Sequence, residues 1–378
     1  STILITNLVM TIFAYSRYGS KNGVGLIYHG DCSTVKQLDR WLHLLINILS
    51  TGMLSASNFC MQLQAAPTRG KVDAAHEEGK WLDIGIHSLR NLRYLDKRQR
   101  ISWALLALTS IPIHLMGFIL VVVEAFLLSR ATASLRLRNF KVSIIELWKL
   151  GFGELTPYTY LYINMPRTDP AGLIANVILA NMPQIILSVV YILYNTMLST
   201  FLFQREFSRM CERKRRKPLR VSEPVGIQRS SYSISLPLRY GIPLSASSTL
   251  MHWVVSQSLF LARVRAVQPD GSDDDVNSFS TCGHSPIALF SSMIGTIAIM
   301  LVIVGLGLRR YDGTMRMVST NSLAISAACH VLPEDRENGY LLPVQWGVVE
   351  MKGGVGKCAM TTAAAETIRL PKVGLGYM

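Results

Sequence analysis

The sequence predicts an all-α, polytopic transmembrane helical bundle of about six spans, with both termini on the cytoplasmic side. Of the 378 residues, 49% are hydrophobic and only 16% are charged, whereas soluble globular proteins are about 25% charged. The same apolar excess excludes an intrinsically disordered chain. The few charged residues are also unevenly placed, because five long stretches contain no Asp, Glu, Lys or Arg.

The five uncharged stretches are each long enough for a membrane-spanning helix, which needs about 20 apolar residues. In chain order they hold 28, 23, 35, 23 and 33 residues. The uncharged segment 1–16 predicts a further span, of which this chain holds a remnant. We therefore expect a transmembrane domain over 1–307, with spans near 1–16, 42–64, 101–123, 173–203, 245–262 and 286–307, followed by a cytoplasmic tail over 308–378.

The Lys and Arg residues give the orientation, because cytoplasmic connections of membrane proteins carry an excess of them. Segments 67–100, 204–243 and the tail after 308 hold 8, 10 and 8 of the 38 basic residues, or 26 together. The other connections, 17–40, 130–171 and 268–284, hold 4, 6 and none. Arg263 and Arg265 are an exception at the outer end of the fifth span. The net charge of +14 thus indicates topology and predicts no nucleic-acid partner.

Polar residues recur at helical spacing inside several spans and predict a polar core between the helices. The candidate core residues are His43, Asn47, Asn58 and Gln62 in span two, His114 in span three, Asn181, Gln184 and Asn195 in span four, and His252 and Gln257 in span five. We expect them mainly to form interhelical hydrogen bonds, worth about 0.6 kcal/mol each. The alternative is a path for a solute or ion. We expect Glu124, at the end of span three, to lie at the membrane interface.

Two cysteines fall in connections that this topology places outside. Cys32 and Cys282 would meet an oxidising compartment, so a disulfide between them is a hypothesis. On the cytoplasmic side, the basic run Arg213, Lys214, Arg215, Arg216 and Lys217 predicts contact with anionic lipid.

The C-terminal segment Lys352–Lys357 is similar to the phosphate-binding loop of ParA/MinD-like ATPases. Cys358 stands where a magnesium-binding hydroxyl is needed, and too few residues follow for a parallel sheet, so we interpret the likeness as fortuitous. No Ser-His-Asp or Cys-His arrangement can be placed in one compartment, and no metal-ligand spacing is present. We therefore expect no enzymatic activity, cofactor or metal.

Several stretches together resemble a fungal family of multipass membrane proteins that is classed as a domain of unknown function. They include Gly-Asp-Cys (30–32), Trp-Leu-His-Leu-Leu-Ile-Asn (41–47), Ser-Asn-Phe-Cys-Met-Gln (57–62), Trp-Leu-Asp-Ile-Gly (81–85), Asn-Met-Pro-Gln (181–184), His-Trp-Val-Val-Ser-Gln-Ser-Leu-Phe (252–260) and Ala-Ile-Ser-Ala-Ala-Cys-His (324–330). The resemblance implies an integral membrane protein and supplies no catalytic residues. We expect a sensor or scaffold with a polar interhelical core, and the alternative function is a channel or transporter.

Overall fold

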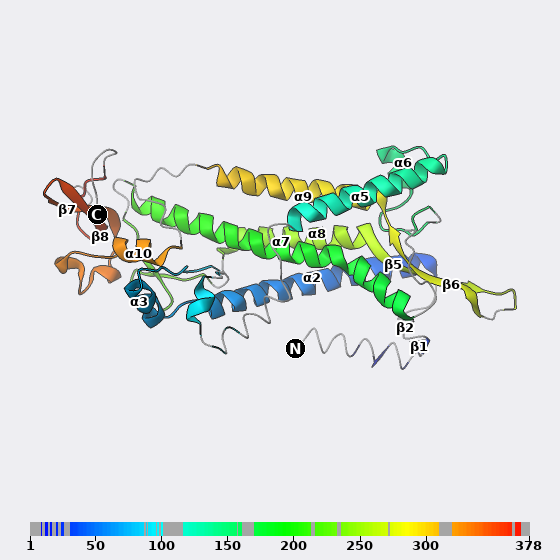
Figure 1. Cartoon of the computed structure of the whole chain (residues 1–378), viewed down its shortest axis with the longest axis horizontal. Helices are drawn as coiled ribbons and strands as arrows, with labels where there is room; N and C mark the ends of the chain where they lie inside the picture. The colour runs from blue at the N-terminus through cyan, green and yellow to red at the C-terminus, as the bar shows by residue number, and fades with distance from the viewer. Residues whose placement is uncertain are drawn as a thin grey trace. The chain divides into compact units, whose positions relative to one another are not determined.

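The computed structural model consists mostly of helices (Figure 1). It describes residues 31–86, 88, 90–95, 97, 100, 116–156, 158–160, 170–212, 216–232, 236–270, 273–309, 320–364 and 367–371, together with 9, 12–13, 16, 20–21 and 24–25. The helices are α2 (Cys32–Ala65), α3 (Arg69–Glu77), α5 (Met116–Leu137), α6 (Ile144–Lys149), α7 (Pro170–Met210), α8 (Leu238–Ser258), α9 (Pro286–Gly307) and α10 (Ser322–Ala328), with short 3₁₀ helices η1 (Asn91–Tyr94), η2 (Pro333–Asp335) and η3 (Gly339–Leu341).

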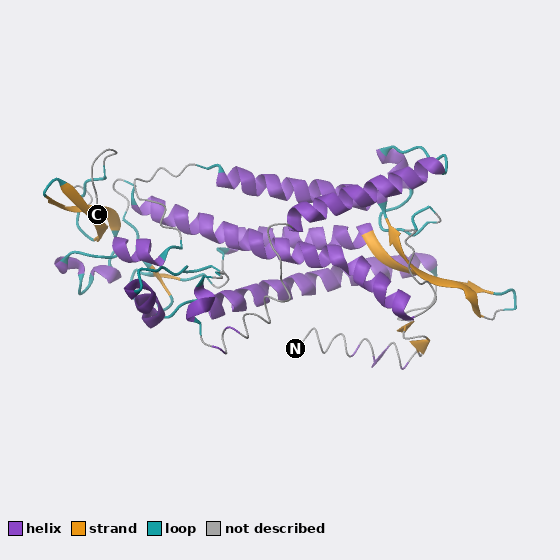
Figure 2. Cartoon of the chain, viewed as in Figure 1, coloured by secondary structure: helices purple, strands orange, loops and turns teal. Residues whose placement is uncertain are grey.

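The described residues also contain four two-stranded sheets (Figure 2), so the predicted all-α class is corrected to a helical protein with β-hairpins. The short pairs are β1 (Ser20–Lys21) with β2 (Val24–Gly25) and β3 (Arg220–Val221) with β4 (Arg229–Ser230). The longer antiparallel hairpins are β5 (Leu259–Val267) with β6 (Asp273–His284) and β7 (Gln345–Lys352) with β8 (Val355–Thr361).

Within the part of the chain that the structure describes, three helices are long and apolar enough to cross a membrane: Ser33–Leu63 within α2, Gly172–Met210 within α7, and α9. They coincide with the spans predicted at 42–64, 173–203 and 286–307. Large apolar side chains such as Ile174, Ile178 and Leu301 are exposed on α7 and α9. Large apolar side chains exposed along a helix are typical of membrane or protein contact.

The other predicted spans differ from the structure or lie outside it. Span five is a helix that ends at Ser258, because residues from Leu259 onward pair with β6. Residues 101–115 of span three and most of 1–16 lie outside the described residues. α5 continues 14 residues past the predicted end at 123 and ends at Leu137, two residues before Asn139, whose φ of 56° is left-handed. The Phe140 N–H bonds the Leu135 carbonyl there, closing the helix with a Schellman motif.

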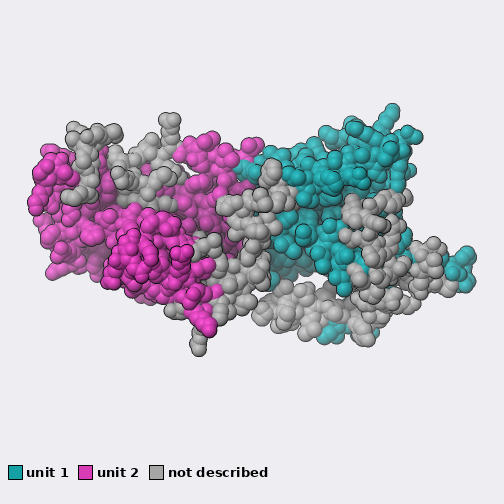
Figure 3. All heavy atoms as spheres, viewed as in Figure 1, with its two compact units in different colours: residues 1–55, 112–191, 245–300 teal, residues 56–111, 192–244, 301–378 magenta. Residues whose placement is uncertain are grey.

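The chain divides into two compact units (Figure 3). Unit 1 contains residues 1–55, 112–191 and 245–300, and unit 2 contains 56–111, 192–244 and 301–378. In unit 1, α7 and α8 pack through Ile186, Leu187, Met251 and Val255. In unit 2, the end of α7 packs with α10 and the β7–β8 hairpin through Met210, Cys211, Ala328, Val344, Trp346 and Met360. The boundary predicted at residue 307 stays a prediction.

Candidate functional site

Most polar side chains of the unit 1 helices bond to their own helix. The Asn47 amide donates to the His43 carbonyl (2.8 Å), and the Ser188 hydroxyl donates to the Gln184 carbonyl (3.0 Å). The Thr296 hydroxyl donates to the Ser292 carbonyl in the same way (2.9 Å). Such bonds to the preceding turn satisfy a hydroxyl or amide without a neighbouring helix.

One hydrogen bond joins two long helices within unit 1. The hydroxyls of Ser55 on α2 and Tyr191 on α7 lie 2.7 Å apart. Ser55 also donates to the Thr51 carbonyl (2.9 Å), so the Tyr191 hydroxyl is the donor in the interhelical bond. This pair is the kind of interhelical contact that the polar stripes predict.

Several buried polar atoms of unit 1 have no hydrogen-bond partner among the residues that the structure describes. Those that lie in helices are the Thr51 and Ser248 hydroxyls, Nε2 of His252 and both carboxyl oxygens of Glu124. A buried polar atom without a partner costs about 1–3 kcal/mol. Native proteins keep few such atoms, and each one calls for an explanation such as a bound ion or water.

Glu124 is the most notable of these groups, because it is an ionisable side chain buried between helices. Its side chain is only 2% exposed, and its carboxyl faces the buried hydroxyl of Ser292 on α9. That hydroxyl donates to the Leu289 carbonyl (3.0 Å), so it has no proton to give to the carboxyl. Ser292 lies six residues into α9, about 9 Å along the helix axis at 1.5 Å per residue. Glu124 is therefore buried between α5 and α9, about 9 Å from the first residue of α9 along its axis.

Close packing connects the helices around this carboxyl. A Cβ added at Gly295 of α9 would lie 2.5 Å from the Met251 sulfur of α8, so the missing side chain lets these helices approach. Met251 in turn packs against Ile186 and Leu187 of α7. The contacts Glu124–Ser292, Gly295–Met251, Met251–Ile186 and Ser55–Tyr191 thus link α5, α9, α8, α7 and α2.

The predicted core residues differ in how deeply they are buried. His252 and Gln257 are buried in α8, and Asn47 is buried in α2. His43 is half-buried and lies 3.4 Å from Asp39 of its own helix, and Gln184 is half-buried on α7.

Asn181 departs from the predicted core, because it is exposed and its amide bonds the Val177 carbonyl (2.8 Å). It lies in the N-terminal half of α7, where its neighbours Ile178 and Met182 are also exposed. Asn58 and Asn195 are buried and Gln62 is half-buried, but all three belong to unit 2. His114 lies outside the described residues.

The base of the β5–β6 hairpin holds two further buried groups. Cys282 is a free thiol that donates to Oδ1 of Asn176 (3.4 Å), so it forms no disulfide in the structure. The side chain of its predicted partner, Cys32, lies outside the described residues. Burial raises the pKa of Cys282 to about 11. Burial also lowers the pKa of His284 to about 4, and its ring nitrogens have no partner among the described residues.

The segment that is similar to a phosphate-binding loop forms the turn of the β7–β8 hairpin. Lys352 pairs with Val355, and Gly353 and Gly354 have φ values of 58° and 82°. Two residues with positive φ make a type I′ turn, which favours Gly at both positions. A strand follows these glycines, whereas the nucleotide-binding motif requires a helix.

The basic run after α7 is only partly described, because 213–215 lie outside the described residues. The Lys217 backbone exchanges two 2.9 Å hydrogen bonds with Val344. Its burial, with Arg209 nearby, lowers the pKa of the Lys217 side chain. Lys217 is thus part of the fold of unit 2, and lipid contact by this run stays a prediction.

A family model described as "Domain of unknown function (DUF8419)" matches residues 57–373. The chain belongs to this family. The DUF8419 match contains Glu124, Ser248, His252 and Ser292, and it confirms the resemblance to a family classed as a domain of unknown function. No curated protein and no solved structure matches the chain.

Proposed function

We propose that this protein is a multipass integral membrane protein of about six spans, with both termini cytoplasmic, whose polar interior carries a small cation or polar solute across the bilayer. The observation that carries the proposal is Glu124. Ionisable residues inside transmembrane helices are rare and usually mark ion or substrate paths. The distribution of basic residues supports the proposed orientation, because 26 of the 38 lie in the connections that it assigns to the cytoplasm.

The hydrogen-bond pattern favours transport over a purely structural polar core. If the polar stripes only held helices together, their side chains would bond across helices. Ser188 and Asn47 bond to their own helix instead, while Glu124, Ser248 and His252 keep unpaired atoms among the described residues. A cation or polar solute with its water would supply the missing partners.

The second candidate function is a sensor or scaffold without transport or enzymatic activity. The Ser55–Tyr191 bond supports it, because this contact is helix packing. In both candidates the partner is the lipid bilayer, with anionic lipid at the basic run 213–217 and no nucleic acid.

Reconstitution of the full chain into liposomes tests the proposal. We expect flux of H⁺, Na⁺ or K⁺ above that of empty liposomes, with a loss of at least tenfold in Glu124→Gln. Glu146→Gln is the matched control, because Glu146 pairs with Lys149 at the surface of unit 1 (2.6 Å). Liposomes impermeable to all three ions, or equal flux in Glu124→Gln and wild type, would contradict transport of these ions through the polar interior.

A further inference from the structure

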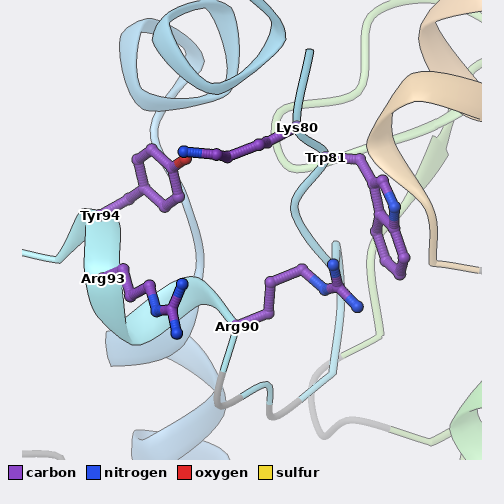
Figure 4. A pocket seen from close by; sticks show the side chains of 5 residues that line it. All are labelled: Lys80, Trp81, Arg90, Arg93 and Tyr94. Carbon is purple, nitrogen blue, oxygen red and sulfur yellow. The ribbon is translucent and has the colours of Figure 1, made fainter. Parts of the chain in front are cut away.

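A basic and aromatic pocket lies in unit 2, in the segment from the end of α3 to η1 (Figure 4). The cavity has a volume of about 350 Å³ and is lined by Lys80, Trp81, Arg90, Arg93 and Tyr94. Small-molecule sites begin at about 300 Å³, so the pocket has room for a small ligand. Neither the polar interior of unit 1 nor the proposed transport uses it.

The loop that forms the pocket is fixed by a buried asparagine. The Asn91 side chain is 1% exposed, accepts a hydrogen bond from the Asp83 N–H (2.9 Å) and donates to the Asp83 carbonyl (2.7 Å). These two hydrogen bonds hold Asp83 and Asn91, the two ends of the loop, next to each other. It places Arg90 directly before η1 and Arg93 within it.

Two of the three cations are held in place by neighbours. The Arg90 guanidinium carbon lies 3.6 Å from the centre of the Trp81 ring, an attraction between a cation and an aromatic face. The Glu78 carboxylate accepts from the Lys80 ammonium (2.6 Å) and from the Tyr94 hydroxyl (3.1 Å). These hydrogen bonds lower the pKa of Glu78, so it stays ionised.

The carboxylates around the pocket do not neutralise it. Asp83 accepts from the Ser88 hydroxyl (2.6 Å) and from the Thr320 hydroxyl (3.0 Å). Its oxygen is 4.0 Å from Arg90, beyond hydrogen-bond distance. Glu78 and Asp83 therefore leave one net positive charge on the three lining cations.

Arg93 carries that charge. Among the residues that the structure describes, its guanidinium has no ion pair or hydrogen bond, and in Figure 4 it points into the space between Lys80 and Arg90. An arginine presents a planar fork of N–H donors that matches the oxygens of a phosphate group. The pocket thus offers fixed donors and an uncompensated fork to an anion.

We propose that this pocket binds a phosphate monoester through Arg93 and Arg90, with Lys80 and Tyr94 at its rim. The proposed orientation places segment 67–100 at the cytoplasmic surface, where anionic phospholipids and soluble phosphorylated metabolites are both present. The two sources share the same chemistry, so a test must separate them.

Binding to the purified full chain distinguishes these sources. One arm titrates inositol 1,4,5-trisphosphate into the protein in detergent. The other compares nanodiscs of phosphatidylcholine with nanodiscs that also contain phosphatidylinositol 4,5-bisphosphate. Saturable binding in the first arm assigns a soluble ligand, and saturable binding only in the second assigns a lipid headgroup.

Two variants that each remove one positive charge, one inside the pocket and one outside it, separate specific binding from general attraction of anions to a basic protein. Arg93→Gln should weaken binding at least tenfold, and Arg93→Lys should give an intermediate loss because it keeps the charge without the fork. Arg69→Gln is the control, since Arg69 pairs with Asp73 one turn along α3 (3.0 Å) and does not line the pocket. Equal weakening in Arg93→Gln and Arg69→Gln, or no saturable binding in either arm, overturns the proposal. Arg93 is exposed, so the variants should keep the wild-type unfolding transition.

Discussion

Replacing Glu124 with methionine should stabilise the helix bundle of unit 1. Methionine is unbranched, flexible and apolar, so it fills the same space without the carboxyl. An acidic side chain at the centre of a membrane helix costs about 3 kcal/mol. Glu124 faces Ser292, about 9 Å into α9; with the proposed hydrocarbon layer of about 30 Å starting at the first residue of α9, this is roughly three fifths of the way to its middle. Scaling the cost by that depth gives a gain of about 2 kcal/mol, within the range found when buried ionic groups become apolar.

Reversible unfolding in mixed detergent micelles measures this gain, with circular dichroism reporting helix content. A gain of about 2 kcal/mol raises the ratio of folded to unfolded protein roughly thirtyfold. Glu146→Met is the control, because Glu146 and Lys149 form a surface pair and such pairs contribute about 0–1 kcal/mol. If Glu124→Met were less stable than wild type, the carboxyl would have a stabilising partner and the argument from its unpaired oxygens would fail.

Two further predictions concern unit 1. In a double-mutant cycle of Ser55→Ala and Tyr191→Phe, the unfolding free energies should show a coupling of about 0.6 kcal/mol; zero coupling would mean that the 2.7 Å contact adds no stability. Burial lowers the pKa of His284 from 6.5 to about 4, so the stability that its neutral form provides is complete above pH 6.5 and is lost as the pH falls toward 4. That loss is about 3 kcal/mol at 1.36 kcal/mol per pH unit, and His284→Asn should remove this part of the acid sensitivity; an identical pH dependence in variant and wild type would contradict a buried neutral imidazole.

The uncharged runs predicted the helix positions best where nothing competes with a helix. α9 begins and ends at the predicted residues, since Pro286 suits a first helical position and the apolar run continues for the length of a span. The fifth span failed because the absence of charge does not distinguish a helix from a strand. Arg263 and Arg265 contradicted the charge rule for loops, and their two-residue spacing is the period of a strand. Their apparent violation was the signal for β5.

The candidate site was only partly predictable, for a different reason. Helical periodicity predicted an interior face for Asn47 and His252, because a residue's face follows from its spacing, and both side chains are buried. It could not show that Asn181 is exposed, since periodicity does not reveal which turns of α7 are covered. It also could not show that Glu124 is buried between helices, because that burial depends on how α5 is aligned with Ser292 of α9. That alignment is set by packing between segments far apart in the sequence.

Uncharged polar side chains and the carboxyl of Glu124 are therefore unequal as evidence for transport. Serine, threonine and asparagine can satisfy themselves on the preceding turn, as Asn47, Ser188 and Thr296 do, so their number says little about transport. A carboxyl oxygen cannot accept from its own helix, because the N–H groups of the helix interior are already bonded. Glu124 must find a donor or a cation elsewhere, and the described residues provide none. The proposal of transport thus depends on one carboxyl, and a variant that removes only its charge is the most direct way to decide between a path and packed helices.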